Sequence, residues 1–85
     1  MKRKPTKTLA LIFKRPVSGS VRFGDALALL QDLGAAVETN REGSRIAVVL
    51  FDEVRVMHKP HPSPDMDKGA VTALRDWLEA NGVHP

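Results

Sequence analysis

The clearest pattern in the chain is a stretch of apolar residues at helical spacing before Gly34. Apolar side chains recur there every three or four positions, at Phe23, Ala26, Leu27, Leu30 and Leu33. This spacing places them on one face of an α-helix. Gly34 is a natural stop, because glycine adopts the left-handed backbone that often ends a helix. The segment "RFGDALALLQDLG" is therefore predicted to be an amphipathic helix.

After Gly34 the pattern becomes that of β-strands. Three strand-like segments follow: "AAVET" (35–39), "RIAVVLF" (45–51) and "VRVMHK" (54–59). The second is rich in β-branched residues, and the third alternates apolar and polar positions, which is the period of a half-buried strand. The segment 40–44 reads as a turn, and Asp52 with Glu53 as a tight connection. The pattern predicts a meander of three antiparallel strands.

The tight connection also predicts how the last two strands pair. A two-residue turn at Asp52 and Glu53 sets a register: Phe51 opposite Val54, Val49 opposite Val56, and Ala47 opposite His58. One face then holds Arg45, Ala47, Val49, Phe51, Val54, Val56 and His58, and the other holds Ile46, Val48, Leu50, Arg55, Met57 and Lys59. The charges of Arg55 and Lys59 favour solvent for their face. His58 is therefore expected at the edge of the core face.

Two further helices are predicted near the ends of the chain. The first spans about residues 7–14 and ends before Pro16, with Leu9, Ile12 and Phe13 on one face. The last spans about residues 67–81, burying Val71, Leu74 and Trp77 or Leu78. Prolines at 60, 62 and 64 exclude regular structure just before it. The result is an α+β fold of order α-α-β-β-β-α, with helices on one face of a three-stranded antiparallel sheet.

Charge is distributed unevenly along this sequence. The first 22 residues carry seven basic side chains and no acidic one, whereas residues 23–85 carry six basic and ten acidic ones, a net of −4. Residues 1–21 are interpreted as a basic N-terminal extension of a domain formed by residues 22–85. Two roles stay open for the extension: non-specific affinity for phosphates, or a solubilising tail.

Composition restricts the class of protein. Eighty-five residues make one small domain, and the absence of cysteine excludes disulfides and thiolate metal sites. No apolar run approaches the roughly 20 residues needed to cross a bilayer. The start has the outline of a signal peptide, but Lys14 and Arg15 follow directly and no small-residue cleavage site is present. A soluble cytoplasmic protein is expected.

Several motifs, taken in order, resemble a known family. A helix ending in "LG", a strand, a "GS" turn, two strands, a "PHP" corner and the helix start "DKGAVTALRDWLEANG" are together similar to the HicA family of bacterial toxins. The resemblance covers about residues 22–83. It implies a fold like that of a double-stranded-RNA-binding domain. It also implies a toxin that cleaves mRNA until an antitoxin of the HicB type neutralises it.

The sequence departs from this family at one position. The family's signature after the turn is Gly-Ser-His, and the histidine is regarded as essential for RNA cleavage. Gly43 and Ser44 match, but Arg45 occupies the third position. Arginine cannot act as a base near neutral pH, although it can hold a phosphate with two hydrogen bonds. Gly43, Ser44 and Arg45 are therefore candidates for binding RNA phosphate.

Two histidines are candidates for proton transfer, because imidazole titrates near neutral pH. His61 lies between Pro60 and Pro62 and occupies the Pro-His position shared with the family. His58 is expected near Arg45, so that Arg45 binds the phosphate while His58 exchanges protons. The structural alternatives are that His61 shapes the corner through a hydrogen bond and that His58 is a satisfied histidine at the core edge.

Two lysines complete the candidate site, Lys59 and Lys68. Lys68 opens the last helix, where free backbone N–H groups attract anions. Asp65 and Asp67 compete for the same donors, and capping is the favoured interpretation there. His84, at the terminus, is set aside. No metal or other cofactor is expected, because the prolines keep the histidines and aspartates of this segment from converging on one ion.

Two functions of different classes follow. The first is a toxin that acts as a metal-independent endoribonuclease, with His61 and His58 as its catalytic residues and a HicB-type antitoxin as its partner. The second is a non-catalytic module that binds RNA or a partner protein and has lost the turn histidine, since Arg45 stands in its place.

Overall fold

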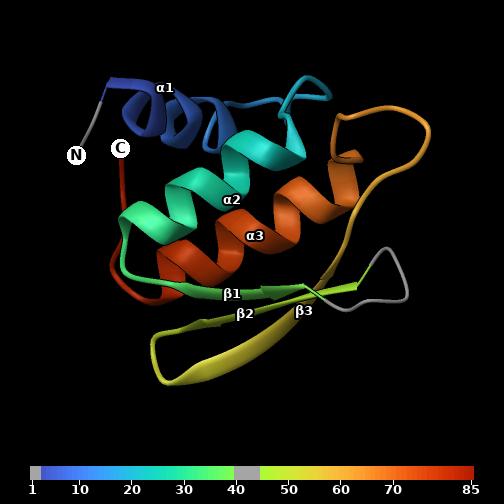
Figure 1. Cartoon of the computed structure of the whole chain (residues 1–85). Coiled ribbons are helices and arrows are strands. Elements are labelled where there is room, and N and C mark those ends of the chain that lie inside the picture. Colours follow the sequence, from blue (N-terminus) through green and yellow to red (C-terminus); the bar gives the residue numbers. More distant parts are fainter. Residues whose placement is uncertain (1–2, 40–44) are drawn as a thin grey trace.

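The computed structural model describes residues 3–39 and 45–85. Its elements are α1 (Arg3–Ile12), α2 (Phe23–Asp32), β1 (Ala36–Thr39), β2 (Arg45–Leu50), β3 (Glu53–His58) and α3 (Lys68–Ala80). The strands form one antiparallel sheet in the order β1-β2-β3, and the helices lie on one face of it (Figure 1). The predicted α+β fold and its order α-α-β-β-β-α are confirmed.

The core lies between the helices and the sheet. Helices α2 and α3 lie over the sheet, and α1 lies on their far side (Figure 1). The largest fully buried side chains come from the helices, the sheet and the loop before α2: Ile12, Val21, Leu29, Leu30, Val48, Val71 and Leu78. Glycines with positive φ follow α2 and α3, at Gly34, as predicted, and at Gly82. In the described part of the chain, no helix is long and apolar enough to cross a membrane.

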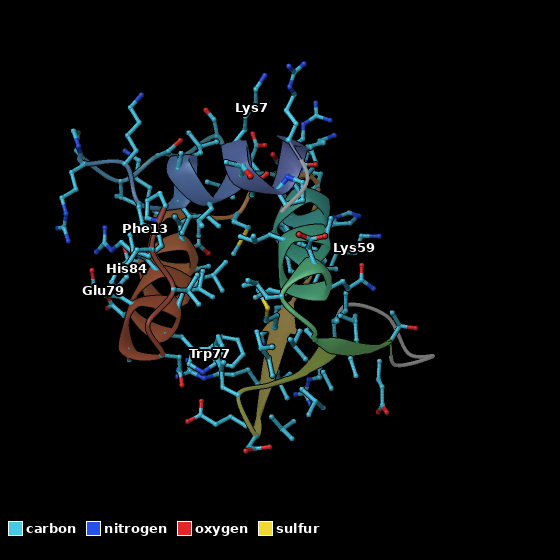
Figure 2. All side chains as sticks on the ribbon, turned by 90° about the vertical axis from the view of Figure 1, so that its left-hand side faces the viewer. Lys7, Phe13, Lys59, Trp77, Glu79 and His84 are labelled. Atoms are coloured by element: carbon cyan, nitrogen blue, oxygen red, sulfur yellow. The ribbon has the colours of Figure 1, made fainter. Side chains whose placement is uncertain are left out.

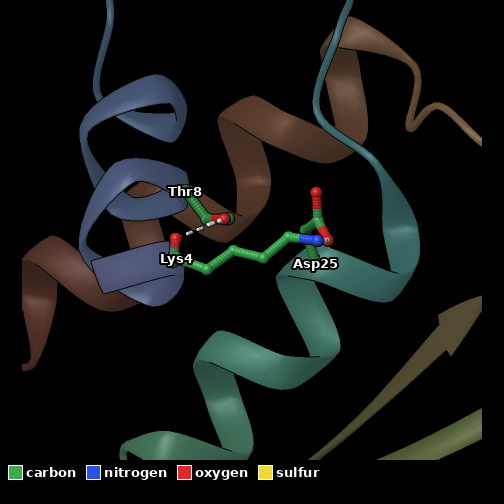
Figure 3. Close-up of polar contacts among 3 residues, drawn as sticks. All are labelled: Lys4, Thr8 and Asp25. Carbon is green, nitrogen blue, oxygen red and sulfur yellow. Dashed lines mark hydrogen bonds and ion pairs between the residues drawn. The ribbon is translucent and has the colours of Figure 1, made fainter. Parts of the chain in front are cut away.

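Helix α1 is built into this core. It starts and ends earlier than predicted, and it buries Leu9 and Ile12 against the rest of the protein. The Thr8 hydroxyl donates to the Lys4 carbonyl at 3.1 Å, and the Lys4 ammonium lies 3.3 Å from the Asp25 carboxylate on α2 (Figure 3). The basic segment that precedes residue 22 therefore contributes a packed helix, on which Arg3, Lys4 and Lys7 stay exposed.

The hairpin between β2 and β3 differs from the prediction by two positions in register. Its two-residue loop consists of Phe51 and Asp52, which have φ of 56° and 59°, and the loop is closed by the pair Leu50 and Glu53. Left-handed backbone at both positions is the geometry of the two-residue hairpin turn. The predicted turn at Asp52 and Glu53 was wrong, because the bulky Phe51 occupies a left-handed position that is usual for asparagine or glycine.

The two faces of the hairpin were grouped correctly, but the predicted sides were reversed. Ile46, Val48 and Leu50 are buried, whereas Val54 and Val56 are 67% and 58% exposed. The face that carries Arg55 and Lys59 is thus the core face, and His58 lies on the open face. A charged side chain fits at the edge of the core face because the Arg55 guanidinium lies over the Trp77 ring, 4.9 Å from its centroid.

Trp77 links α3 to the hairpin. Its ring is buried, and it meets the Phe51 ring edge-on at 5.4 Å between centroids. Its indole N–H donates to the Glu53 carboxylate. Phe51 and Trp77 therefore serve packing, and their rings join the loop of the hairpin to the helix.

Candidate functional site

Arg45 and His58 are direct neighbours on the open face of the sheet. Arg45 begins β2, His58 ends β3, and the register sets the two residues opposite each other. Both are exposed. The prediction placed Ala47 opposite His58, which left Arg45 two positions away. In the structure Ala47 pairs with Val56, so Arg45 itself lies opposite His58. The two side chains thus lie together as expected, although the register that led to this expectation was wrong.

The hairpin geometry indicates what kind of pair this is. A two-residue loop is closed by a pair that exchanges backbone hydrogen bonds, here Leu50 and Glu53. Bonded and non-bonded pairs alternate along an antiparallel ladder, so Arg45 and His58 form a non-bonded pair. In such pairs the Cα atoms are about 4.5 Å apart and the side chains are closest. A guanidinium and an imidazole on this pair can contact one phosphate together.

The structural alternatives for the two histidines lose support. His58 lies on the open face of the sheet, so it is not a histidine at the core edge. His61 is exposed in the segment between β3 and α3, and no hydrogen bond joins its side chain to any described residue. The side chains of Arg45, His58, Lys59 and Lys68 likewise form no hydrogen bond or ion pair with the described residues. Within the described part of the chain, no partner occupies these groups.

The remaining predicted residues are distributed less compactly. Lys59 follows His58 directly and is exposed. Lys68 opens α3 and its side chain extends towards Gly19, where an added Cβ would lie 3.5 Å from the lysine Cε. Gly43 and Ser44 lie outside the described residues. The structure therefore pairs Arg45 with His58 on the open face of the sheet. Lys59 follows on the opposite face, beside Phe23 and Gly24 of α2, and Lys68 lies near another loop.

The start of α3 is occupied by a cap. The Asp67 carboxylate accepts from the Ala70 backbone N–H at 2.7 Å. Asp65 does not cap the helix; it forms an isolated bridge with Arg22. Because one of the free donors is already satisfied by a carboxylate, this helix start is a poor anion site. The capping interpretation is confirmed for Asp67.

A groove between β3 and α3 was not predicted from the sequence. It has a volume of about 340 Å³ and is lined by apolar side chains from both elements, including Met57, Leu74 and Trp77, with Ala70 and Ala73 on the helix side. His58 and Lys59 line its β3 side. The available signal was the pair of alanines at helical spacing, since small side chains leave room beside a neighbouring element.

A second set of cations lies on α1 and in the loop after it: Arg3, Lys7, Lys14 and Arg15, all exposed. Helix α1 lies on the side of α2 and α3 that faces away from the sheet (Figure 1). Lys7 and Lys59 accordingly occupy separate parts of the surface (Figure 2). Across residues 3–39 and 45–85, no group of three or more His, Cys, Asp or Glu could hold a metal ion.

Comparison of the chain with family models, with curated proteins and with solved structures gives no match. The likeness to the HicA family therefore rests on the sequence motifs and on the order of elements. The likeness to a double-stranded-RNA-binding domain stays a prediction on the same basis.

Proposed function

We propose that this chain is the toxin of a toxin–antitoxin pair, a metal-independent endoribonuclease that acts on mRNA in the cytoplasm and is neutralised by a HicB-type antitoxin. The observation that carries the proposal is the exposed cross-strand pair of Arg45 and His58. An arginine can hold a phosphate and a neighbouring imidazole can exchange a proton, and both are needed to cleave RNA through its own 2′-hydroxyl.

The proposed step needs no group from outside the RNA and the protein. The His58 imidazole takes the proton of a 2′-hydroxyl, and the resulting oxygen attacks the adjacent phosphorus. Arg45 holds two non-bridging phosphate oxygens and stabilises the charge that develops on them. The bond to the 5′-oxygen breaks, and protonated His61 gives that oxygen its proton. The products are a 2′,3′-cyclic phosphate and a 5′-hydroxyl.

Lys59 has a supporting role in this proposal. It is exposed next to His58, so its ammonium adds to the positive potential at the end of β3. Attraction of the phosphate backbone raises the rate of encounter and falls with salt. Lys59→Gln should therefore weaken RNA binding with little effect on the rate of the bound complex.

The test is RNA cleavage by the purified chain in excess chelator. His58→Ala and His61→Ala are each expected to lower the rate by roughly 100- to 10,000-fold, the usual contribution of one placed proton-transfer group. His84→Ala is the matched control, because His84 is exposed and its ring lies 6.4 Å from the Phe13 ring, on another part of the surface. Undiminished cleavage in both His58→Ala and His61→Ala would remove this site from the proposal.

A second function is favoured by one observation, the arginine at the position where the family has its essential histidine. On this alternative the chain binds RNA without cleaving it. Arg45→His then discriminates the two, since it restores an imidazole directly opposite His58. Cleavage that appears only in Arg45→His identifies the natural chain as a binding module. Cleavage already present in the natural chain supports the ribonuclease.

A further inference from the structure

Strand β3 forms an open edge of the sheet. Among residues 3–39 and 45–85, the sheet order β1-β2-β3 leaves β3 paired on one side only. An unpaired edge offers a row of backbone N–H and C=O groups to another strand, and natural proteins usually cover or break such an edge. Here the edge is six residues long and carries two exposed valines, Val54 and Val56.

The hairpin register tells which backbone groups point outwards. Glu53, Arg55 and Met57 fall on the pairs that exchange hydrogen bonds with β2, beginning from the pair that closes the loop. The N–H and C=O groups of Val54, Val56 and His58 therefore point away from β2. A new strand beside β3 would form its hydrogen bonds with these three residues.

The surroundings of this edge specify the side chains of such a strand. Val54 and Val56 lie on the open face, and Met57 lines the groove beside Leu74 and Trp77. These positions suit apolar partners. Three basic side chains interrupt them, at Arg55, His58 and Lys59.

Among the described residues, no carboxylate forms an ion pair with these three side chains. The Glu53 carboxylate accepts from the Trp77 indole N–H, and the Asp67 carboxylate caps α3. Opposite residues 54 to 59, the complementary order is therefore apolar, acidic, apolar, apolar, acidic, acidic.

We infer that the β3 edge and the adjoining groove bind an extended segment of a partner protein, which adds to the sheet as a fourth strand and carries this pattern of apolar and acidic residues. Backbone hydrogen bonds supply affinity in such strand addition, and the side-chain pattern supplies specificity. The charges of Arg55 and Lys59 supply the complementarity that selects an acidic segment, and His58 adds a hydrogen-bond donor.

A nucleic acid fits the same edge poorly. The outward carbonyls of Val54, Val56 and His58 need donors, whereas a phosphate backbone offers acceptors. Trp77 is 4% exposed and already contacts Phe51 and Arg55, so its face is not open for stacking on a base. The edge therefore favours a polypeptide.

The bound strand would also regulate the proposed site. It would cover His58 and Lys59, which belong both to this edge and to the RNA site. This regulatory part rests on the proposed ribonuclease or RNA-binding function, whereas strand binding itself does not. A partner bound here would exclude RNA by occupying the same histidine.

The experiment uses the full chain and a synthetic peptide with blocked ends, of sequence Glu-Glu-Leu-Val-Glu-Val, which is the complementary order written for an antiparallel strand. Hydrogen exchange followed by NMR is the readout. At saturating peptide, the amides of Val54, Val56 and His58 should exchange at least tenfold more slowly. The amides of Arg55 and Met57, which already face β2, should change little. This alternating response is specific to strand addition.

The charge requirement is tested with a matched pair of variants. Lys59→Glu, at the edge, should weaken peptide binding at least tenfold, whereas Lys7→Glu, on α1, should leave it within twofold; both residues are exposed, so both variants should fold. Replacing the three glutamates of the peptide by lysines should abolish binding.

Equal binding by the two variants, or saturation without protection of the outward amides, would overturn the inference. Protection of these amides by single-stranded RNA and not by the peptide would do the same, and would assign the edge to nucleic acid. None of these measurements uses RNA cleavage. Their result can therefore be interpreted even if the chain proves not to be a ribonuclease.

Discussion

Truncation of Ile12 tests whether the basic N-terminal segment belongs to the fold. Ile12 is fully buried, and Ile12→Ala removes three side-chain carbons from the core. At about 0.8 kcal/mol per carbon the transfer cost is roughly 2.4 kcal/mol, and the cavity left behind brings the expected loss to about 3 kcal/mol. A domain of this size has a total stability of roughly 4–13 kcal/mol. The variant should fold with a large part of its stability gone.

The assay is urea unfolding followed by the fluorescence of Trp77, the only tryptophan of the chain. With a slope of about 1.5 kcal/mol per molar urea, the midpoint should fall by about 2 M while the slope stays constant. Lys7→Ala is the control on the same helix, because Lys7 is exposed, and it should change stability by less than about 0.5 kcal/mol. Equal midpoints for the two variants would show that α1 does not pack against the core, and would refute the reasoning.

Four further substitutions test local features of the fold. Asp67→Ala removes the carboxylate that accepts from the Ala70 N–H and should lower stability by about 1 kcal/mol; thermal melting measures this, and no change would mean that the cap contributes nothing. Asp52→Gly should raise stability by about 1 kcal/mol, since Asp52 has a φ of 59° that glycine adopts without strain; a loss in urea unfolding would contradict the turn geometry. Val48→Lys should cost about 4 kcal/mol or more and Val54→Lys less than about 0.5 kcal/mol, because the first is buried and the second is 67% exposed. The reverse order in the same assay would restore the predicted assignment of the sheet faces.

The order of elements could be predicted because the spacing of apolar residues in each segment fits either a helix or a strand and not both. Helical spacing before Gly34 and strand-like segments after it left little choice of element type. The side of the hairpin could not be predicted in the same way, because both of its faces carry apolar residues. The prediction therefore used charge to choose the solvent face, and it chose the wrong face because Arg55 lies on the core face. A long side chain at a sheet edge can lie on the core face when an aromatic ring such as Trp77 receives its cation.

In the candidate site, too, some features could be predicted from the sequence and others could not. Proximity of Arg45 and His58 could be predicted because both belong to adjacent strands, and an error of two positions in register keeps every side chain on the same face. The exposure of His58 could not be predicted, since it depends on which face the helices cover. The groove beside β3 also escaped prediction, because it arises where Ala70 and Ala73 happen to face the edge strand. The two alanines are at helical spacing, but the sequence does not say which neighbouring element their face meets.

The position of α1 changes how its cations must be tested. Deleting the first 22 residues would remove Leu9, Ile12 and Val21 from the core, so a loss of RNA binding after deletion would report unfolding. The informative change neutralises exposed cations such as Lys7 and leaves the buried side of the helix intact.

For single-stranded RNA, each phosphate that the variant no longer neutralises should reduce the slope of log affinity against log salt by about 0.7. Because α1 and the open face of the sheet lie on opposite sides of the α2–α3 layer (Figure 1), the contribution of Lys7 should add to that of Arg45 only for an RNA long enough to pass around the protein. For a short oligonucleotide, only one of the two substitutions, that of Lys7 or that of Arg45, should weaken binding. The substitution that does so identifies the primary RNA-binding face.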